Sequence, residues 1–322
     1  MLQIIFAGNT KFSGIIFKNI IKLGYKIQTI LTKSDKKFGR GMFLKTSFVK
    51  KLAINYKIEF IQPRSLNLEG KYKHDALYSY NSINKNKPDI LIIVAYCLIL
   101  PKWLIDCTKY GCINIHASIL PRWRGAAPIQ RTLESGDKKT GITLIDIDSN
   151  LDTGNILNIN LIKISKIETN ILLFKRLANL GSLEICKLLL NLSSKKIESF
   201  NQSKIGILYA NKINKKDIDI NFSKPSKLLE FFIKALHNNY NFNMKLPGII
   251  GKIKIVKVES INNFKYKKEL SGNILFFNNS GIYVNCKKGI LRILKVKRPG
   301  KYSQIIKNFI HGLKIDKLND FV

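Results

Sequence analysis

The chain has 322 residues, of which 45% are hydrophobic, and its formal net charge at pH 7 is +34. This length suffices for two domains of ordinary size, and the apolar content argues against a chain that is disordered throughout. Five scattered cysteines without a Cys-x-x-Cys pair argue against a disulfide scaffold and a structural zinc site, so we expect a reduced, cytoplasmic protein.

The source of the positive charge has two interpretations. Lysine supplies 47 of the 55 basic residues, and asparagine and isoleucine are also abundant, as expected where coding DNA is rich in A and T. In the first interpretation, the positive charge reflects mutational bias. In the second interpretation, the positive charge serves to attract nucleic acid, and this attraction would weaken as the salt concentration rises.

The N-terminal segment has the pattern of a strand followed by a helix. Residues Leu2–Ala7 form an apolar run without a preceding basic region, so no signal peptide is predicted. Residues Phe12–Leu23 have helical spacing and end before Gly24. The turn between them lacks Gly-x-Gly-x-x-Gly, and the chain contains no P-loop motif, so neither nicotinamide nor P-loop ATP binding is expected.

Strand-like and helix-like patterns alternate through the first half of the chain. The further strand candidates are Lys26–Leu31, Ile58–Ile61, Asp89–Val94 and Gly111–His116. This alternation predicts an α/β fold with a mainly parallel, Rossmann-like sheet and helices on both faces, which binds ligands beyond the carboxyl ends of its strands. The longest apolar stretch, Ile90–Leu100, is too short to span a membrane, so no membrane partner is expected.

Three polar side chains are predicted to meet where these strands end. Period-two alternation places Asn114 and His116 on the same face of their strand. The runs Thr140–Ile147 and Ile156–Ile164 are predicted to pair as edge strands, and the loop between them can return the carboxylate of Asp152 toward the histidine. An amide, an imidazole and a carboxylate together form a usable acyl-transfer site. By itself, the Asn-x-His pattern also fits a polar strand end, with a histidine whose hydrogen bonds are satisfied within the protein and which has no catalytic role.

The second half of the chain is predicted to form a smaller, basic β domain. A helical pattern at Glu168–Leu192 closes a first domain that spans residues 1–192, and the polar run 193–206 is suited to a linker. Residues 207–322 contain 23 lysines and arginines against 7 acidic residues. After a helical segment at Pro225–His237, short strand candidates indicate a small β-barrel. These candidates are Ile249–Val258, Gly272–Phe277, Gly281–Cys286 and Leu291–Val296.

The order and spacing of motifs in the middle of the chain resemble a known family. Residues 114–131 read NIHASILPRWRGAAPIQR, and Gly-Asp, Thr-Gly-Ile-Thr and Leu-Asp-Thr-Gly follow, the last at 151–154. This pattern closely resembles the methionyl-tRNA formyltransferases, which belong to the wider 10-formyltetrahydrofolate-dependent formyltransferase family. The resemblance spans nearly the whole chain, is strong at 89–154 and becomes weak after about residue 225. It implies that the C-terminal domain is OB-like.

The resemblance implies transfer of a formyl group from 10-formyltetrahydrofolate, without a metal, to the α-amino group of methionyl-initiator tRNA for translation initiation. The matching catalytic positions are Asn114, His116 and Asp152. Asn114 offers an amide N–H to the developing oxyanion, and His116 can donate to that oxygen or relay a proton. Asp152 would orient His116 or accept the amine proton through water, and the division of proton transfer between the two stays open.

The resemblance also implies a folate-binding turn and one wall of a pterin pocket. The residues of the turn, which contact tetrahydrofolate mostly through backbone, are Ser118, Ile119, Leu120 and Pro121. The apolar run Val94–Leu100 provides the wall, although Cys97 stands where the family usually has glycine.

A basic loop and the basic tail are implied as tRNA-binding parts. The loop at 38–50 resembles the segment that engages the tRNA acceptor end, with Arg40 and Lys45 as contacts. The alternative is a solvated, lysine-rich loop. The basic β domain fits a tRNA platform, and its alternative is a β domain of a lysine-rich genome. Arg122 and its neighbours Arg124 and Arg131 are interpreted as related to the site.

Two other functions remain as alternatives. The enzyme could use another formyl acceptor, such as an amino sugar or water, but a small acceptor needs neither the basic loop nor the basic tail. A tRNA-binding relative without activity would not need the three catalytic positions. We expect a monomeric protein.

Overall fold

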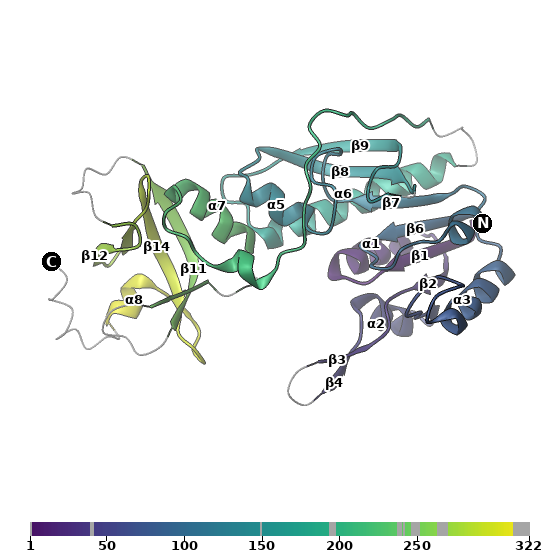
Figure 1. Cartoon of the computed structure of the whole chain (residues 1–322), viewed down its shortest axis with the longest axis horizontal. Helices are drawn as coiled ribbons and strands as arrows, with labels where there is room; N and C mark the ends of the chain where they lie inside the picture. Colours follow the sequence, from purple (N-terminus) through teal and green to yellow (C-terminus); the bar gives the residue numbers. More distant parts are fainter. Residues whose placement is uncertain are drawn as a thin grey trace. The chain divides into compact units, whose positions relative to one another are not determined.

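The computed structural model describes residues 2–38, 42–148, 150–192, 198–236, 240, 242–245, 252–262 and 270–311. The chain forms two compact units (Figure 1). The first unit comprises Met1–Pro128, Lys139–Lys163 and Leu173–Ala210. The second unit comprises Ile129–Lys138, Ile164–Leu172 and Asn211–Val322. No helix in the described part of the chain is long and apolar enough to cross a membrane.

A seven-stranded sheet forms the centre of the first unit. Its strands are β1 (Ile4–Gly8), β2 (Ile27–Leu31), β5 (Glu59–Ile61), β6 (Ile90–Val94), β7 (Cys112–His116), β8 (Lys139–Asp146) and β9 (Ile156–Lys163). The spatial order is β5-β2-β1-β6-β7-β8-β9; the first five strands are parallel, and β8 and β9 join antiparallel. The predicted mainly parallel sheet and its edge-strand pair are confirmed.

Helices cover both faces of this sheet. They are α1 (Lys11–Lys22), α2 (Phe48–Asn55), α3 (Lys73–Lys85), α4 (Lys102–Asp106) and α6 (Asn170–Asn191), the last from residue 173 onward. On one face, the rings of Phe6 in β1 and Phe17 in α1 meet edge to face at 5.5 Å. On the other face, Ile83 of α3 and Leu104 of α4 are buried in one core cluster with Ile5. The predicted layering is therefore confirmed.

Local sequence signals explain why one helix was predicted and another was not. Thr10 begins α1 with a capping box: its hydroxyl accepts the Ser13 N–H at 3.2 Å, and the Ser13 hydroxyl accepts the Thr10 N–H at 3.2 Å. Helix α3 is not among the predicted elements. Its buried residues are Ala76, Ser79 and Ile83, and because only the isoleucine is strongly apolar, the hydrophobic period is weak.

The second unit contains an antiparallel sheet, as predicted for the smaller β domain. Its strands are β10 (Phe242–Lys245), β11 (Lys252–Ile261), β12 (Ile274–Asn278), β13 (Gly281–Asn285), β14 (Ile290–Lys297) and β15 (Ser303–Ile305). Strands β10-β11-β14-β13-β12 are neighbours in this order, and β15 pairs with β14. The helices are α5 (Pro128–Glu134), the short 3-10 helix η1 (Lys215–Ile218), α7 (Ser226–Leu236) and α8 (Ile306–His311).

Candidate active site

The carboxyl end of β7 presents two of the predicted catalytic side chains. Ile113 and Ile115 are buried in the sheet, so Asn114 and His116 share the alternate face of the strand. The side chain of His116 is only 5% exposed, and Asn114 is half-buried. The strand therefore presents both groups as the sequence pattern predicts.

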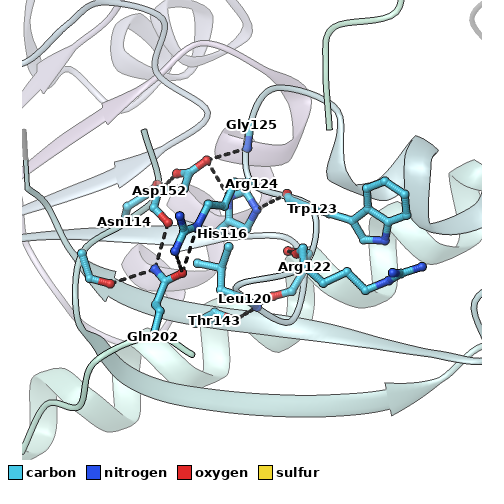
Figure 2. Close-up of polar contacts among 12 residues, drawn as sticks. Asn114, His116, Leu120, Arg122, Trp123, Arg124, Gly125, Thr143, Asp152 and Gln202 are labelled. Atoms are coloured by element: carbon cyan, nitrogen blue, oxygen red, sulfur yellow. Dashed lines mark hydrogen bonds and ion pairs between the residues drawn. The ribbon is translucent and has the colours of Figure 1, made fainter. Parts of the chain in front are cut away.

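The turn between β8 and β9 brings Asp152 to these two side chains (Figure 2). Asn114 Nδ2 donates to Asp152 Oδ1 at 3.0 Å. His116 Nδ1 lies 3.5 Å from Asp152 Oδ2, and the carboxylate is 8% exposed. An amide, an imidazole and a carboxylate thus meet in one largely buried site within the first unit.

Backbone groups complete the environment of the Asp152 carboxylate. The Gly125 N–H donates to Asp152 Oδ2 at 2.8 Å. Asp152 itself has a left-handed φ of +55°, a conformation that non-glycine residues rarely adopt and that surrounding contacts must hold. Two residues later, a Cβ atom on Gly154 would lie 1.9 Å from the Asp146 carbonyl oxygen, so only glycine fits there.

The second ring nitrogen of His116 is held by the loop that follows β7. Nε2 lies 2.9 Å from the Trp123 carbonyl oxygen. A carbonyl oxygen only accepts hydrogen bonds, so Nε2 carries a hydrogen in this arrangement. Nδ1 is the ring nitrogen that faces the Asp152 carboxylate. A substrate oxygen bound by Nε2 would have to replace the Trp123 carbonyl as its acceptor.

The half-buried amide of Asn114 retains hydrogen-bonding capacity. One N–H is used by Asp152, and within the described ranges no acceptor is assigned to the other. A neutral donor that is held in place from one side and open on the other suits an oxygen that becomes negative during a reaction.

The turn at 118–121, which the family resemblance assigns to folate, is held mainly by bonds within the protein. Ser118 and Leu120 are buried, and the other two members are partly buried. The Ser118 hydroxyl donates to the Arg122 carbonyl at 2.6 Å. Thr143 Oγ1 donates to the Ser118 carbonyl at 2.7 Å and accepts the Leu120 N–H at 3.2 Å. The turn is therefore rigidly attached to β8.

The apolar run Val94–Leu100, which the family resemblance assigns to the wall of the pterin pocket, is only partly buried. Ala95 adopts a left-handed φ of +47°, Cys97 is exposed, and Ile99 is 92% exposed. Tyr96 packs against the core beneath the sheet, and burial raises the pKa of its hydroxyl. Burial likewise raises the pKa of the Asp146 carboxyl at the end of β8.

A short antiparallel hairpin of β3 (Lys36–Phe38) and β4 (Phe43–Lys45) overlaps the predicted tRNA loop at 38–50. Lys45 is exposed, and Arg40 lies outside the described residues. The hairpin also exposes three consecutive apolar side chains, which the sequence reasoning did not single out. They are Met42 at 58%, Phe43 at 77% and Leu44 at 67% exposure.

The three arginines that follow β7 have different surroundings. The Arg122 guanidinium lies 4.6 Å from the Trp123 ring centroid. Arg124 is 7% exposed and donates through Nε and Nη2 to Gln202 Oε1 at 3.1 and 2.7 Å. Arg131 belongs to the second unit, where it donates to Glu134 at 2.7 Å.

Gln202 is a site residue that the sequence reasoning missed. Its Nε2 donates to the carbonyl oxygens of Asp152 and Gly154, each at 2.8 Å (Figure 2). It lies in a polar stretch with no periodic pattern, so no sequence signal distinguishes it from a linker residue. In the parts of the chain that the structure covers, no group of three His, Cys, Asp or Glu side chains is arranged to hold a metal ion.

The chain is similar to known formyltransferases over nearly its whole length. A family model described as formyl transferase matches residues 2–188, and one described as formyl transferase, C-terminal domain, matches residues 212–314. The chain is 34% identical over 311 residues to the methionyl-tRNA formyltransferase of Bordetella pertussis, covering 97% of this chain and 99% of that protein. It is 35% identical over 314 residues to the methionyl-tRNA formyltransferase of Albidiferax ferrireducens, with 98% and 97% covered.

The fold also has solved counterparts. The crystal structure of an N-formyltransferase from Helicobacter canadensis, in complex with folinic acid and dTDP-3-aminofucose, has a TM-score of 0.63 and 21% identity. The match covers 91% of this chain and 99% of that one. At this identity, the likeness concerns the fold.

Proposed function

The chain belongs to the formyl transferase family, and we propose that it transfers the formyl group of 10-formyltetrahydrofolate to the α-amino group of methionyl-initiator tRNA. The product would be N-formylmethionyl-tRNA for translation initiation. Curated methionyl-tRNA formyltransferases match this chain over 97% of its length or more. The observation that carries the proposal is the meeting of Asn114, His116 and Asp152 at the end of β7 in such a chain.

The proposed reaction needs a proton acceptor and a stabilised oxyanion, and it needs no protein nucleophile. The neutral amine of the methionyl group attacks the formyl carbon, and the carbonyl oxygen takes the negative charge of the tetrahedral intermediate. The free N–H of Asn114 is the proposed donor to that oxygen, because a fixed neutral donor stabilises charge as it develops. The intermediate collapses when the C–N10 bond breaks and N10 takes up a proton.

His116 and Asp152 are the proposed proton-handling pair. Asp152 Oδ2 lies 3.5 Å from His116 Nδ1 and also accepts the Gly125 N–H. The carboxylate stabilises a positive charge on the ring, so the imidazolium can form while the amine loses its proton. The amine proton passes to the pair directly or through water. The pair then gives a proton to N10 of the departing tetrahydrofolate.

The folate donor is proposed to bind at the turn 118–121 and along the run 94–100, as the family resemblance implies. Both segments follow strands of the parallel part of the sheet at their carboxyl ends, where such sheets bind ligands. The amino-sugar ligand in the structure from Helicobacter canadensis concerns that protein. No observation on this chain favours an amino sugar or water as acceptor.

A formylation assay tests this function. Initiator and elongator methionyl-tRNA are each incubated with the protein, with and without 10-formyltetrahydrofolate, and formylmethionyl-tRNA and tetrahydrofolate are measured. We expect both products only when tRNA and folate are present, with the initiator tRNA preferred. Release of tetrahydrofolate at an equal rate without tRNA, or better use of an amino-sugar nucleotide, would contradict the proposal.

Replacing Arg40 by alanine is expected to lower kcat/KM for the tRNA about 10-fold or more, because a charge-assisted bond to phosphate or a base edge is lost. The KM for the folate should not change. Lys85→Ala is the matched control, since it removes one positive charge from an exposed position of α3. An unchanged kcat/KM for tRNA in the Arg40 variant would refute the role of this loop.

A further inference from the structure

The segment 200–210, here called the strap, runs along the active site of the first unit. At its start, the N–H of Phe200 donates to the Ile156 carbonyl at 3.0 Å, and the N–H of Ile156 donates to the Phe200 carbonyl at 2.8 Å. Ile156 begins β9, directly after the turn that contains Asp152. The strap is thereby attached to the strand that directly follows the Asp152 turn.

The end of the strap is attached to the loop that follows β7. The Arg124 N–H donates to the Leu208 carbonyl at 2.9 Å, and the Ala210 N–H donates to the Arg124 carbonyl at 2.6 Å. The Ala127 N–H adds a bond to the Ala210 carbonyl at 3.0 Å. A Cβ atom on Gly125 would lie 3.0 Å from that same Ala210 oxygen, so the strap passes close to the residue whose N–H binds Asp152.

Between these two attachments, the amide of Gln202 joins the Asp152 turn and the loop that follows β7 through one side chain. Its Nε2 donates to the carbonyls of Asp152 and Gly154, and its Oε1 accepts two bonds from Arg124. An amide has both donor and acceptor ends, and here each end makes two bonds. Arg124 is 7% exposed, and within the described residues both hydrogen bonds of its side chain go to Gln202.

We propose that Gln202 is a positioning residue for formyl transfer, which it supports by holding the backbone of Asp152 so that the carboxylate stays against Asn114, His116 and Gly125. This inference rests on the proposed function. Within the described residues, no hydrogen bond joins the Gln202 side chain to these three residues, and it acts through the backbone at Asp152. The carbonyl that it binds belongs to the residue with φ +55°, a backbone conformation that depends on its surroundings.

The direction of the carboxylate follows from the backbone that carries it. The Cα–Cβ bond of Asp152 is set by the two peptide units that flank its Cα, and the carbonyl of one of them accepts the Gln202 bond. If the turn relaxed, the bonds of 3.0 Å from Asn114 and 2.8 Å from Gly125 would lengthen together. A displacement of about 1 Å at a reacting group can cost up to about 100-fold in rate.

Gln202→Ala is expected to lower kcat by about 10-fold to 100-fold, with KM for folate and tRNA close to wild type. Its melting temperature is expected to fall, because the largely buried Arg124 loses its acceptor. Gln202→Glu keeps an acceptor for Arg124 and nearly the same shape, but it removes both donors to the turn. It should lose kcat to a similar extent, and it serves as the test if the alanine variant does not fold. Ser203→Ala is the matched control, because the Ser203 hydroxyl bonds within the strap, to Ile205.

The result that supports the inference is a fall in kcat for both Gln202 variants and none for Ser203→Ala. Wild-type kcat in either Gln202 variant would overturn it. An equal loss in Ser203→Ala, or a rise in KM with kcat unchanged, would also overturn it, because a merely structural strap would behave in this way. Failure of the proposed function is distinct, since the wild-type protein would then not formylate methionyl-tRNA.

Discussion

Replacing His116 by alanine is expected to lower kcat for formyl transfer by about 10²-fold to 10⁴-fold, the range typical of a lost acid–base group. The variant leaves Asp152 Oδ2 without the ring nitrogen that lies 3.5 Å away, and it leaves the Trp123 carbonyl without its Nε2 donor. Single-turnover formylation measures the loss, and tRNA affinity, measured separately, should stay close to wild type.

The control for this substitution is His74→Ala. His74 is exposed on α3, so the same chemical change there should leave turnover unaltered. Near-wild-type turnover in His116→Ala would end the assignment of His116 to the reaction. A loss of tRNA affinity equal to the loss of kcat would instead indicate that the ring serves binding.

Replacing Asn114 by alanine is expected to lower kcat by about 10²-fold to 10³-fold, or about 3–4 kcal/mol, as for other lost oxyanion donors. Asn114→Asp should be at least as damaging. It keeps the size of the side chain but removes both N–H donors and places a second carboxylate beside Asp152, where an N–H···O bond of 3.0 Å existed. Rate measurements with saturating folate and tRNA test both variants.

Asn81→Ala provides the matched control, since Asn81 is an exposed residue of α3. It should retain wild-type kcat. If Asn114→Ala kept its turnover and only raised KM for the folate, the amide would be a ground-state binding group. The proposed oxyanion role would then be wrong.

The sheet of the first unit is encoded by local pattern. Each apolar run from Leu2 to His116 that reads as a strand is one in the structure, with ends shifted by one or two residues. Alternation along Cys112–His116 was enough to place Asn114 and His116 on one face, because the side-chain period of a strand is fixed by its backbone geometry. Helix α3 was not predicted, because its buried face includes alanine and serine and therefore gives a weak hydrophobic periodicity.

Residues 198–206 show that amino-acid composition alone does not predict which segments bond to the site. Residues 198–206 are largely polar and resemble a linker, yet Phe200 bonds to Ile156 of β9 and Gln202 bonds to the Asp152 turn. Polar composition indicates exposure, and it does not reveal where backbone groups find their partners. The start of the predicted linker, 193–197, lies outside the described residues.

The sequence by itself determined which side chains bring an amide, an imidazole and an acid to the ends of neighbouring strands, because side-chain chemistry and strand period are both readable from residue order. Only the tertiary structure decided what holds them: the Gly125 N–H, the Trp123 carbonyl and the amide of Gln202. The physical reason is that nearly every residue carries the same backbone donor and acceptor. Which of these groups meet depends on the path of the folded chain and leaves no mark in the pattern of residues.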